Sequence, residues 1–184
     1  LYTLAGLFAA LLFPTQIPAD PGKSQICGGE KGFMHRRLNS DQQENLCEVY
    51  AGKVLLVVNT ASRCAFTGQY DGLEKLYGKY REQGLEVMGF PSNDFANQEP
   101  GSEKSVQNFC RMTYGVRFPM YAKTRVTGDD ADPFYAALAL AAGQSPGWNF
   151  HKYLIDRQGR LVGNYNSFVK PQSKTLTMAI EKLL

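Results

Sequence analysis

The run Val54–Val58 constrains the fold of this 184-residue chain more than any other segment. Five consecutive β-branched and aliphatic residues predict a strand buried on both faces of a sheet. The small and polar residues 59–62 suit a tight turn, and Cys64 follows directly. Apolar residues then recur at intervals of three and four from about residue 68 to residue 83, which predicts an amphipathic helix that ends at Gly84.

Cys64 lies between the end of this strand and the first turn of the helix. Backbone N–H groups and the helix dipole favour an anion at such a junction, and the adjacent Arg63 adds a positive charge. The position therefore favours a reactive thiolate. A cysteine can also be a small buried apolar residue. The strand–turn–helix position and the neighbouring cation favour the reactive interpretation.

Composition and charge exclude two classes of function. The net charge is only +3 and no run of basic residues occurs, so we expect no nucleic-acid partner. Four cysteines are present without a C-x-x-C pair, and the two histidines have no ligand spacing, so we expect no metal site. The cysteines are Cys27, Cys47, Cys64 and Cys110.

The first 21 residues differ from the rest of the chain. Residues 4–13 are apolar over the length of a signal-peptide core, too short to span a bilayer, and Ala19 suits a cleavage site. We expect residues 1–21 to be a signal peptide or a disordered terminus, and residues 22–184 to form one domain. A signal peptide predicts a periplasmic or otherwise exported protein; the alternative is a cytoplasmic one.

Export would make Cys27 and Cys47 candidates for a disulfide bond, because they flank a short polar segment. Closing a loop of this size stabilises a fold by roughly 3 kcal/mol in the chain-entropy model. In the cytosol both would be ordinary thiols.

The remaining chain alternates between strand and helix patterns, with a closing hairpin and helix. This order predicts an α/β fold with a central mixed β-sheet flanked by helices. The expected elements are a strand at 85–90, a helix capped by Ser102 that carries Cys110, a strand near 118–121, a helix from Asp132-Pro133 to Gly143, a hairpin at 152–155 and 161–165, and a helix within 171–184.

Three blocks of this sequence resemble the signatures of the glutathione peroxidase family, which has the thioredoxin fold. They are residues 59–67 (NTASRCAFT), 89–101 (GFPSNDFANQEPG) and 148–150 (WNF). The blocks occur in the family's order and spacing, and the resemblance covers nearly all of residues 37–184. It implies a thiol-dependent peroxidase that reduces hydrogen peroxide and organic or lipid hydroperoxides.

The resemblance also implies roles for individual residues. Cys64 matches the peroxidatic residue, whose thiolate attacks a peroxide oxygen and becomes a sulfenic acid. Gln98, Trp148 and Asn149 match the residues that donate hydrogen bonds to the sulfur, so no cofactor or metal is expected. Each of the three has a structural interpretation by itself: a loop amide, a core anchor and a turn residue. Together with Cys64 they favour the catalytic interpretation.

Cys110 matches the resolving cysteine of thioredoxin-dependent members, which implies thioredoxin or glutathione as the thiol reductant. No arginine cluster can be assigned to glutathione. A disulfide needs Cα atoms within about 7 Å, so the helix that carries Cys110 would have to unwind or swing. Gly101 and Gly115, which bracket this segment, would permit that. The alternative is a buried core thiol.

Two departures from the family pattern affect access and assembly. Ala65 replaces the usual glycine after the reactive cysteine, so we expect either a narrower approach to the sulfur or a backbone angle that alanine tolerates, with activity retained. The segment 128–148 lacks the insertion of tetrameric members, which favours a monomer with an open active-site face. Two other functions stay open: a redox sensor, and a thiol–disulfide oxidoreductase, against which Thr67 replaces the second cysteine of a C-x-x-C pair.

Overall fold

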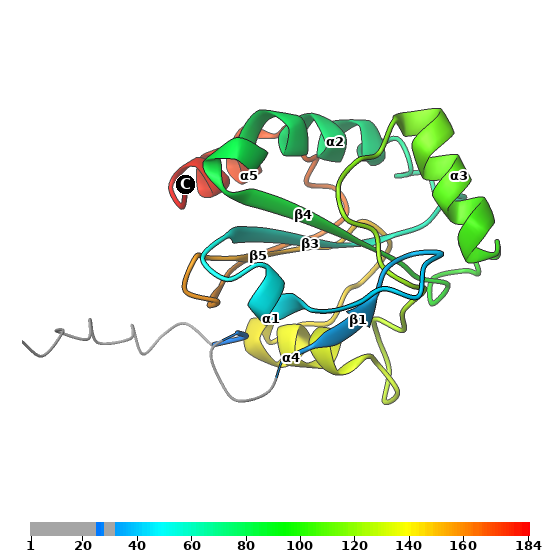
Figure 1. The fold of residues 1–184 in the computed structure, drawn as a ribbon, viewed down its shortest axis with the longest axis horizontal. Coiled ribbons are helices and arrows are strands. Elements are labelled where there is room, and N and C mark those ends of the chain that lie inside the picture. The colour runs from blue at the N-terminus through cyan, green and yellow to red at the C-terminus, as the bar shows by residue number, and fades with distance from the viewer. Residues whose placement is uncertain (1–24, 28–31) are drawn as a thin grey trace, which may run out of the picture.

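A four-stranded sheet in the order β4-β3-β5-β6 lies at the centre of the computed structural model, which describes residues 25–27 and 32–184 (Figure 1). The predicted signal peptide lies outside the described residues. The elements are β1 (Met34–Arg36), β2 (Gln43–Asn45), α1 (Leu46–Val49), β3 (Val54–Thr60), α2 (Gln69–Tyr80), the 3₁₀ turn η1 (Arg81–Gln83), β4 (Leu85–Pro91), α3 (Glu103–Tyr114), α4 (Pro133–Ala142), β5 (Lys152–Ile155), β6 (Leu161–Tyr165) and α5 (Lys174–Glu181).

Strand β3 is the most buried part of the sheet, as its apolar sequence predicts. All seven of its residues are buried, and it pairs in parallel with β4 and antiparallel with β5. Strand β6 completes the sheet by antiparallel pairing with β5. The sheet is therefore mixed, and the fold class is α/β, as expected.

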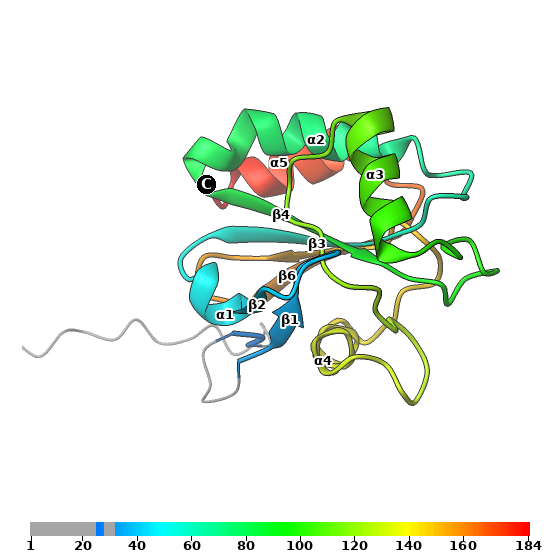
Figure 2. The ribbon, with the colours of Figure 1, turned by 45° about the vertical axis from the view of Figure 1, so that its right-hand side comes forward.

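Helices cover both faces of the sheet. Helices α2, α3 and α5 lie on one face, where Leu73, Val106 and Leu176 join one apolar cluster (Figure 2). Helices α1 and α4 lie on the other face, where Leu46 and Phe134 join a second cluster. The sheet lies between the two clusters, and β3 contributes alternate side chains to each.

The predicted helix boundaries agree with the structure to within a few residues. Gly84 ends the α2–η1 segment in the left-handed conformation, with φ of 103°, and Gly143 ends α4 with φ of 66°. The Ser102 hydroxyl caps α3 by accepting a hydrogen bond from the Ser105 amide, and Asp132 caps α4. The C-terminal helix α5 is shorter than the range expected.

The strand expected near residues 118–121 is absent as a regular element, and this prediction was wrong. Met120 forms an isolated parallel bridge with Gly89, and Tyr121 forms another with Arg37. Pro119 has no N–H to donate, which limits ladder formation at this point. The β1–β2 hairpin and α1 were not predicted, because residues 34–49 show neither an alternating nor a helical apolar pattern.

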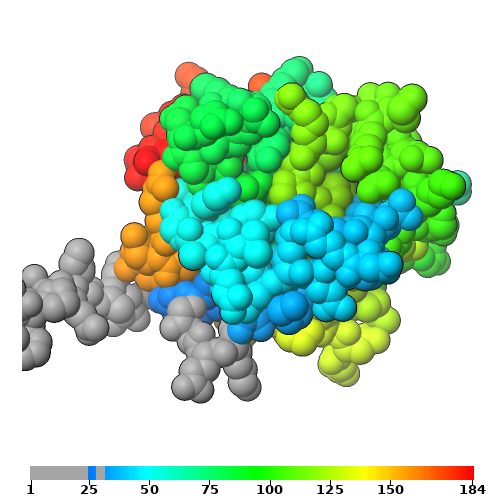
Figure 3. All heavy atoms as spheres, viewed as in Figure 1, coloured from blue at the N-terminus to red at the C-terminus, as the bar shows by residue number. Residues whose placement is uncertain are grey.

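Cys27 and Cys47 form a disulfide bond with a Cα–Cα distance of 5.2 Å, as proposed from the sequence. The amides of Ile26 and Cys27 both donate to Gly159 O in the β5–β6 turn. In the space-filling view the β1–β2 hairpin (blue) lies against the segment from α3 onward (green to yellow-green) (Figure 3). Across the described residues, no helix combines the length and apolarity that crossing a bilayer requires.

Candidate active site

The turn after β3 holds Cys64 by hydrogen bonds to its backbone. The Thr67 hydroxyl accepts from the Cys64 amide and donates to Ala61 O, both at 2.9 Å. The half-buried Cys64 Sγ accepts from the Phe66 N–H at 3.4 Å. A backbone donor thus points at the sulfur, as the strand–helix junction predicts. Helix α2 itself begins only at Gln69, so a separate turn, and not the first helical turn, supplies this donor.

The alanine after Cys64 causes no backbone strain. Ala65 is exposed, and it is not among the non-glycine residues with positive φ in the described part of the chain, which are Asn39, Ala96, Asn97 and Phe150. Because its φ does not require glycine, the methyl group affects only the space beside the sulfur.

Hydrogen bonds join the Cys64 turn to the two other blocks singled out in the sequence. The Arg63 amide donates to Gln98 O at 3.0 Å. The Asn149 side-chain amide donates to Gln98 Oε1 at 2.9 Å. Cys64, Gln98 and Asn149 therefore lie on three segments that are bonded in series, although they are far apart in the chain.

The Trp148–Asn149 pair projects from a turn at the start of β5. Asn149 is fully buried, whereas the Trp148 side chain is 37% exposed and packs on Phe95 with 5.5 Å between ring centroids. Within the described residues, Asn149 Oδ1 is buried without a hydrogen-bond partner.

Asn59 and Lys152 fix this turn, and sequence reasoning missed both. The Asn59 side chain donates a hydrogen bond to Trp148 O at 3.1 Å. The backbone carbonyl of Asn59 accepts one from the Phe150 amide at 2.7 Å. Phe150 has φ of 63°, and the buried Lys152 ammonium donates to its carbonyl at 2.7 Å. Burial lowers the pKa of Lys152 to about 7. A lysine inside an apolar strand was the available signal.

Cys110 lies in the core beneath α3 and is 1% exposed. Burial raises the pKa of its thiol to about 11, a nearby Tyr70 hydroxyl acts in the opposite direction, and the Glu99 carboxylate raises it further. Cys64 and Cys110 are both free thiols. In this structure Cys110 is therefore a buried, protonated thiol. The two sequence-based interpretations, a core residue and a resolving thiol, both stay open.

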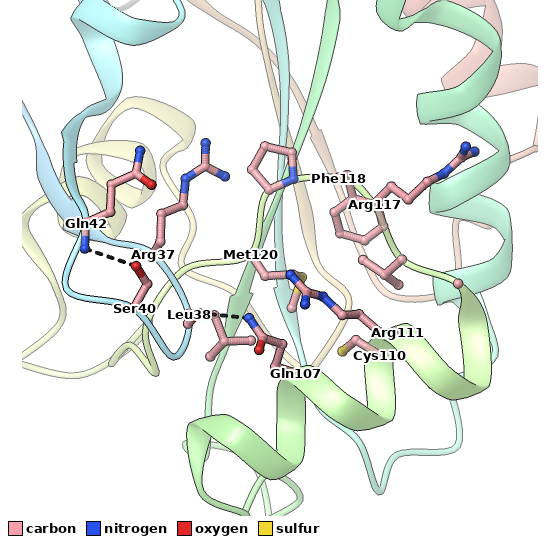
Figure 4. Close-up of a pocket in the computed structure, with 13 residues that line it drawn as sticks. Arg37, Leu38, Ser40, Gln42, Gln107, Cys110, Arg111, Arg117, Phe118 and Met120 are labelled. Carbon is pink, nitrogen blue, oxygen red and sulfur yellow. Dashed lines mark hydrogen bonds between the residues drawn. The ribbon is translucent and has the colours of Figure 1, made fainter.

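A pocket of about 700 Å³ opens beside Cys110, between α3, the loop that follows it and the β1–β2 hairpin (Figure 4). Its floor is apolar, with Leu38, Phe118 and Met120, and its rim carries Arg111 and Arg117. The space gives α3 a loosely packed side next to the cysteine.

The described residues contain no group of three or more His, Cys, Asp or Glu side chains placed to hold a metal ion.

Comparison with known proteins identifies the family. The model of the glutathione peroxidase family matches residues 33–139. The glutathione peroxidase-like peroxiredoxin gpx1 of Schizosaccharomyces pombe is 50% identical over 125 residues, 66% of this chain and 79% of that protein. The hydroperoxy fatty acid reductase gpx1 of Synechocystis is 45% identical over 148 residues, 73% of this chain and 85% of that protein.

Solved structures agree with this assignment. The crystal structure of Trgpx in its apo form superimposes with a TM-score of 0.66 at 32% identity and covers 87% of this chain and 95% of its own. A thiol:disulfide interchange protein of the thioredoxin family from Chlorobium tepidum superimposes with a TM-score of 0.64 at 16% identity, over 91% of this chain and 99% of its own, which shows the fold alone. The chain thus has the thioredoxin fold and belongs to the glutathione peroxidase family of thiol-dependent peroxidases.

Proposed function

We propose that Cys64 is the peroxidatic nucleophile of this peroxidase. Its thiolate attacks the terminal oxygen of a hydroperoxide, the O–O bond breaks, and water or an alcohol leaves while Cys64 becomes a sulfenic acid. The series of hydrogen bonds that joins the Cys64 turn to Gln98 and Asn149 supports this most directly. The donors proposed for the sulfur belong to segments that these bonds join to the Cys64 turn.

Three neutral donors stabilise the charged sulfur and the leaving oxygen in this proposal. The Trp148 indole N–H can only donate, so it suits an anion. Since Gln98 Oε1 already accepts from Asn149, the amide hydrogens of Gln98 stay available for the sulfur or the peroxide. Preorganised donors of this kind favour the thiolate without a metal or an imidazole.

We infer that Cys110 resolves the sulfenic acid as a Cys64–Cys110 disulfide. Because Cys110 is buried under α3, the helix must open before the two sulfurs can meet. Gly115 ends α3 in the left-handed conformation and the pocket beside the helix leaves room for movement. A thioredoxin-like dithiol, or glutathione, then reduces the disulfide.

Stopped-flow peroxide consumption tests both roles. Wild type, Cys64→Ser and Cys110→Ser are compared with thioredoxin or glutathione as the only reductant. We expect Cys64→Ser to be inactive, and Cys110→Ser to consume one equivalent of peroxide and then stop with thioredoxin. Full turnover of Cys110→Ser with thioredoxin would refute the resolving role. Wild-type rates in Cys64→Ser would refute the peroxidatic role.

An apolar surface beside Cys64 supports bulky hydroperoxides as substrates. Phe66 and Phe168 contact each other edge-to-face at 5.2 Å, and Phe168 is 78% exposed. Both line a hollow of about 740 Å³ that Ala65 also borders. The Synechocystis relative, named a hydroperoxy fatty acid reductase, supports an acyl chain as the occupant.

Phe168→Ser tests this substrate class. Loss of one apolar contact of roughly 1.5 kcal/mol should raise KM for linoleic acid hydroperoxide about tenfold and leave the rate with hydrogen peroxide unchanged. Leu140→Ser, an equally exposed apolar position on α4, is the matched control. Equal effects of Phe168→Ser on both peroxides would contradict the proposal.

We further infer that the protein works as a monomer in an oxidising compartment outside the cytoplasm. The Cys27–Cys47 disulfide and the apolar residues 4–13 support export. Cell fractionation of the full chain tests the location, and light scattering of the purified protein tests the monomer. Retention in the cytoplasm, or a stable dimer, would refute the corresponding part.

A further inference from the structure

Glu99 is a buried carboxylate between the Cys64 turn and α3. Its side chain is 1% exposed and follows Gln98 directly in the chain. It borders a pocket of about 190 Å³ that Ser62 and Arg63 line on one side and Phe109 of α3 lines on the other. Within the described residues, Glu99 Oε2 is buried without a hydrogen-bond partner. A buried carboxylate oxygen without a partner is costly, so its retention calls for a reason.

The charges around Glu99 connect it to both cysteines. Burial raises the pKa of Glu99, while the hydroxyl and amide of Ser62, the Lys123 ammonium and the Arg63 guanidinium act in the opposite direction. The negative charge of Glu99 also raises the pKa of Tyr70 of α2 and of Cys110 of α3. Glu99 thus borders the turn of the first cysteine, and its charge acts on the second.

We propose that Glu99 accepts the proton of the Cys110 thiol in the resolving step. This role rests on the two-cysteine cycle proposed above. Ionising Cys110 alone would create a second negative charge beside a carboxylate in a buried site, which is unfavourable. Transfer of the proton to Glu99 only moves one negative charge from oxygen to sulfur, so the total charge of the buried cluster stays constant.

The step balances without an outside base. The Cys110 S–H bond breaks and its proton moves to the Glu99 carboxylate. The new thiolate attacks the sulfur of the Cys64 sulfenic acid, the S–S bond forms and the S–O bond breaks. The departing hydroxide takes the proton from Glu99 and leaves as water. Cys110 is oxidised, the sulfenic sulfur is reduced, and Glu99 returns to its charged form.

The small pocket gives this transfer a location. It lies between the turn that carries Cys64 and Val106 and Phe109 of α3, and Val106 is one helical turn before Cys110 on the buried face of this helix. In the proposed opening of α3, the Cys110 thiol approaches the Cys64 turn on the side of the helix that this pocket borders. The unpaired Glu99 Oε2 lies at this pocket, next to the Cys64 turn.

Glu99→Gln tests the proposal in a single turnover. The full chain is mixed with one equivalent of hydrogen peroxide, and acid quenching with thiol labelling follows disulfide formation. We expect peroxide consumption to stay within about threefold of wild type and disulfide formation to slow about 100-fold, the usual effect of losing a general base. Glu103→Gln is the control. Glu103 also lies on α3, but its carboxylate forms an ion pair with Arg36, with 2.6 Å between nitrogen and oxygen. The substitution should leave both steps unchanged.

The wild-type pH profile provides a second test that needs no variant. Glu99 must be charged to accept a proton, so disulfide formation should slow as the pH falls into the raised titration range of Glu99, and Glu99→Gln should lack this decline. Disulfide formation at the wild-type rate in Glu99→Gln overturns the role of Glu99 alone, as does equal slowing of peroxide consumption. A wild type that forms no Cys64–Cys110 disulfide overturns the two-cysteine cycle instead.

Discussion

The two pairs of cysteines in this chain contrast in every structural respect. Cys27 and Cys47 are bonded, with 5.2 Å between Cα atoms, where the N-terminal residues meet α1. Cys64 and Cys110 are free, one on a half-buried turn and the other inside the core under a helix. The first pair closes a loop in the resting fold, whereas the second requires the fold to open.

This difference would let one chain hold a stable disulfide and, in the proposed cycle, a transient one. Residues 26 and 27 are already held by two hydrogen bonds to Gly159 O, so the bond between Cys27 and Cys47 fits an arrangement that other contacts fix. A Cys64–Cys110 bond would cost the hydrogen bonds and packing of α3. In the proposed cycle we therefore expect the Cys64–Cys110 bond to be easier to reduce, as a catalytic disulfide has to be.

The largest expected effect concerns stability without activity. The double substitution Cys27→Ser/Cys47→Ser should lower the free energy of unfolding by about 3 kcal/mol, because it reopens a loop with a sequence separation of 20. Peroxide turnover should stay within about twofold, since neither residue contacts the Cys64 turn. Urea unfolding and steady-state assays check the two parts. A loss of turnover in the folded variant would show that the two pairs are coupled.

The next effect concerns activity at the second pair. Asn149→Ala should lower turnover about 100-fold, because it removes a proposed donor to the reacting atoms and the hydrogen bond that orients Gln98 Oε1. Asn45→Ala is the matched control. The Asn45 side chain accepts a hydrogen bond from the Cys47 amide at 3.2 Å, so its loss should lower the free energy of unfolding by roughly 1 kcal/mol. Turnover should be unchanged. Asn149→Ala with wild-type kcat would remove Asn149 from the site.

The elements that the sequence predicted correctly are those determined by local residue patterns. Strand β3 follows from five apolar residues, and the ends of α3 and α4 follow from Ser102, Asp132 and Gly143, because capping and turn chemistry act within a few residues. The thioredoxin fold and the positions of the site residues followed from the three blocks that resemble the family, which local patterns alone would not have supplied.

The contacts between distant segments could not be predicted in the same way. In the sequence, Glu99 is one polar residue in a polar loop. The structure shows that it is buried beside the Cys64 turn and α3. The sequence suggests that Asn59 is a turn residue, yet its side chain donates a hydrogen bond to Trp148 O, 89 residues later in the chain. The β1–β2 hairpin is stabilised by contacts such as the bridge from Arg37 to Tyr121, which leave no periodic pattern.

A smaller effect separates the two members of the second pair. Cys110→Ser places a hydroxyl in a buried apolar cluster and should cost about 1–2 kcal/mol of stability. Cys64→Ser, at a half-buried turn, should cost about 0.5 kcal/mol or less. Cys110→Ala is the control that removes the sulfur without adding a buried hydroxyl. Equal costs for the two serine variants in urea unfolding would mean that Cys110 is less enclosed than its burial indicates.

The smallest expected effect is a loss of folding stability at acid pH. It should be the same with and without the Cys27–Cys47 disulfide. Burial lowers the pKa of His151 to about 4 in the folded chain, so the neutral ring is favoured by the fold. The unfolded chain binds the proton first, near pH 6.5, and stability is lost as the pH falls from 6.5 towards 4. Between pH 6.5 and 5.5 the loss should be about 1 kcal/mol.

Urea unfolding at a series of pH values measures this loss, and His151→Phe should remove it. The Cys27→Ser/Cys47→Ser variant should show the same slope from a lower starting stability, because the disulfide shares no hydrogen bond with His151 and distant effects add. A steeper slope in the disulfide-free variant would show that the bond restrains the segment directly before β5, which carries His151. Trp148 and Asn149 lie in the same segment, so the Cys27–Cys47 bond would then be coupled to the candidate site.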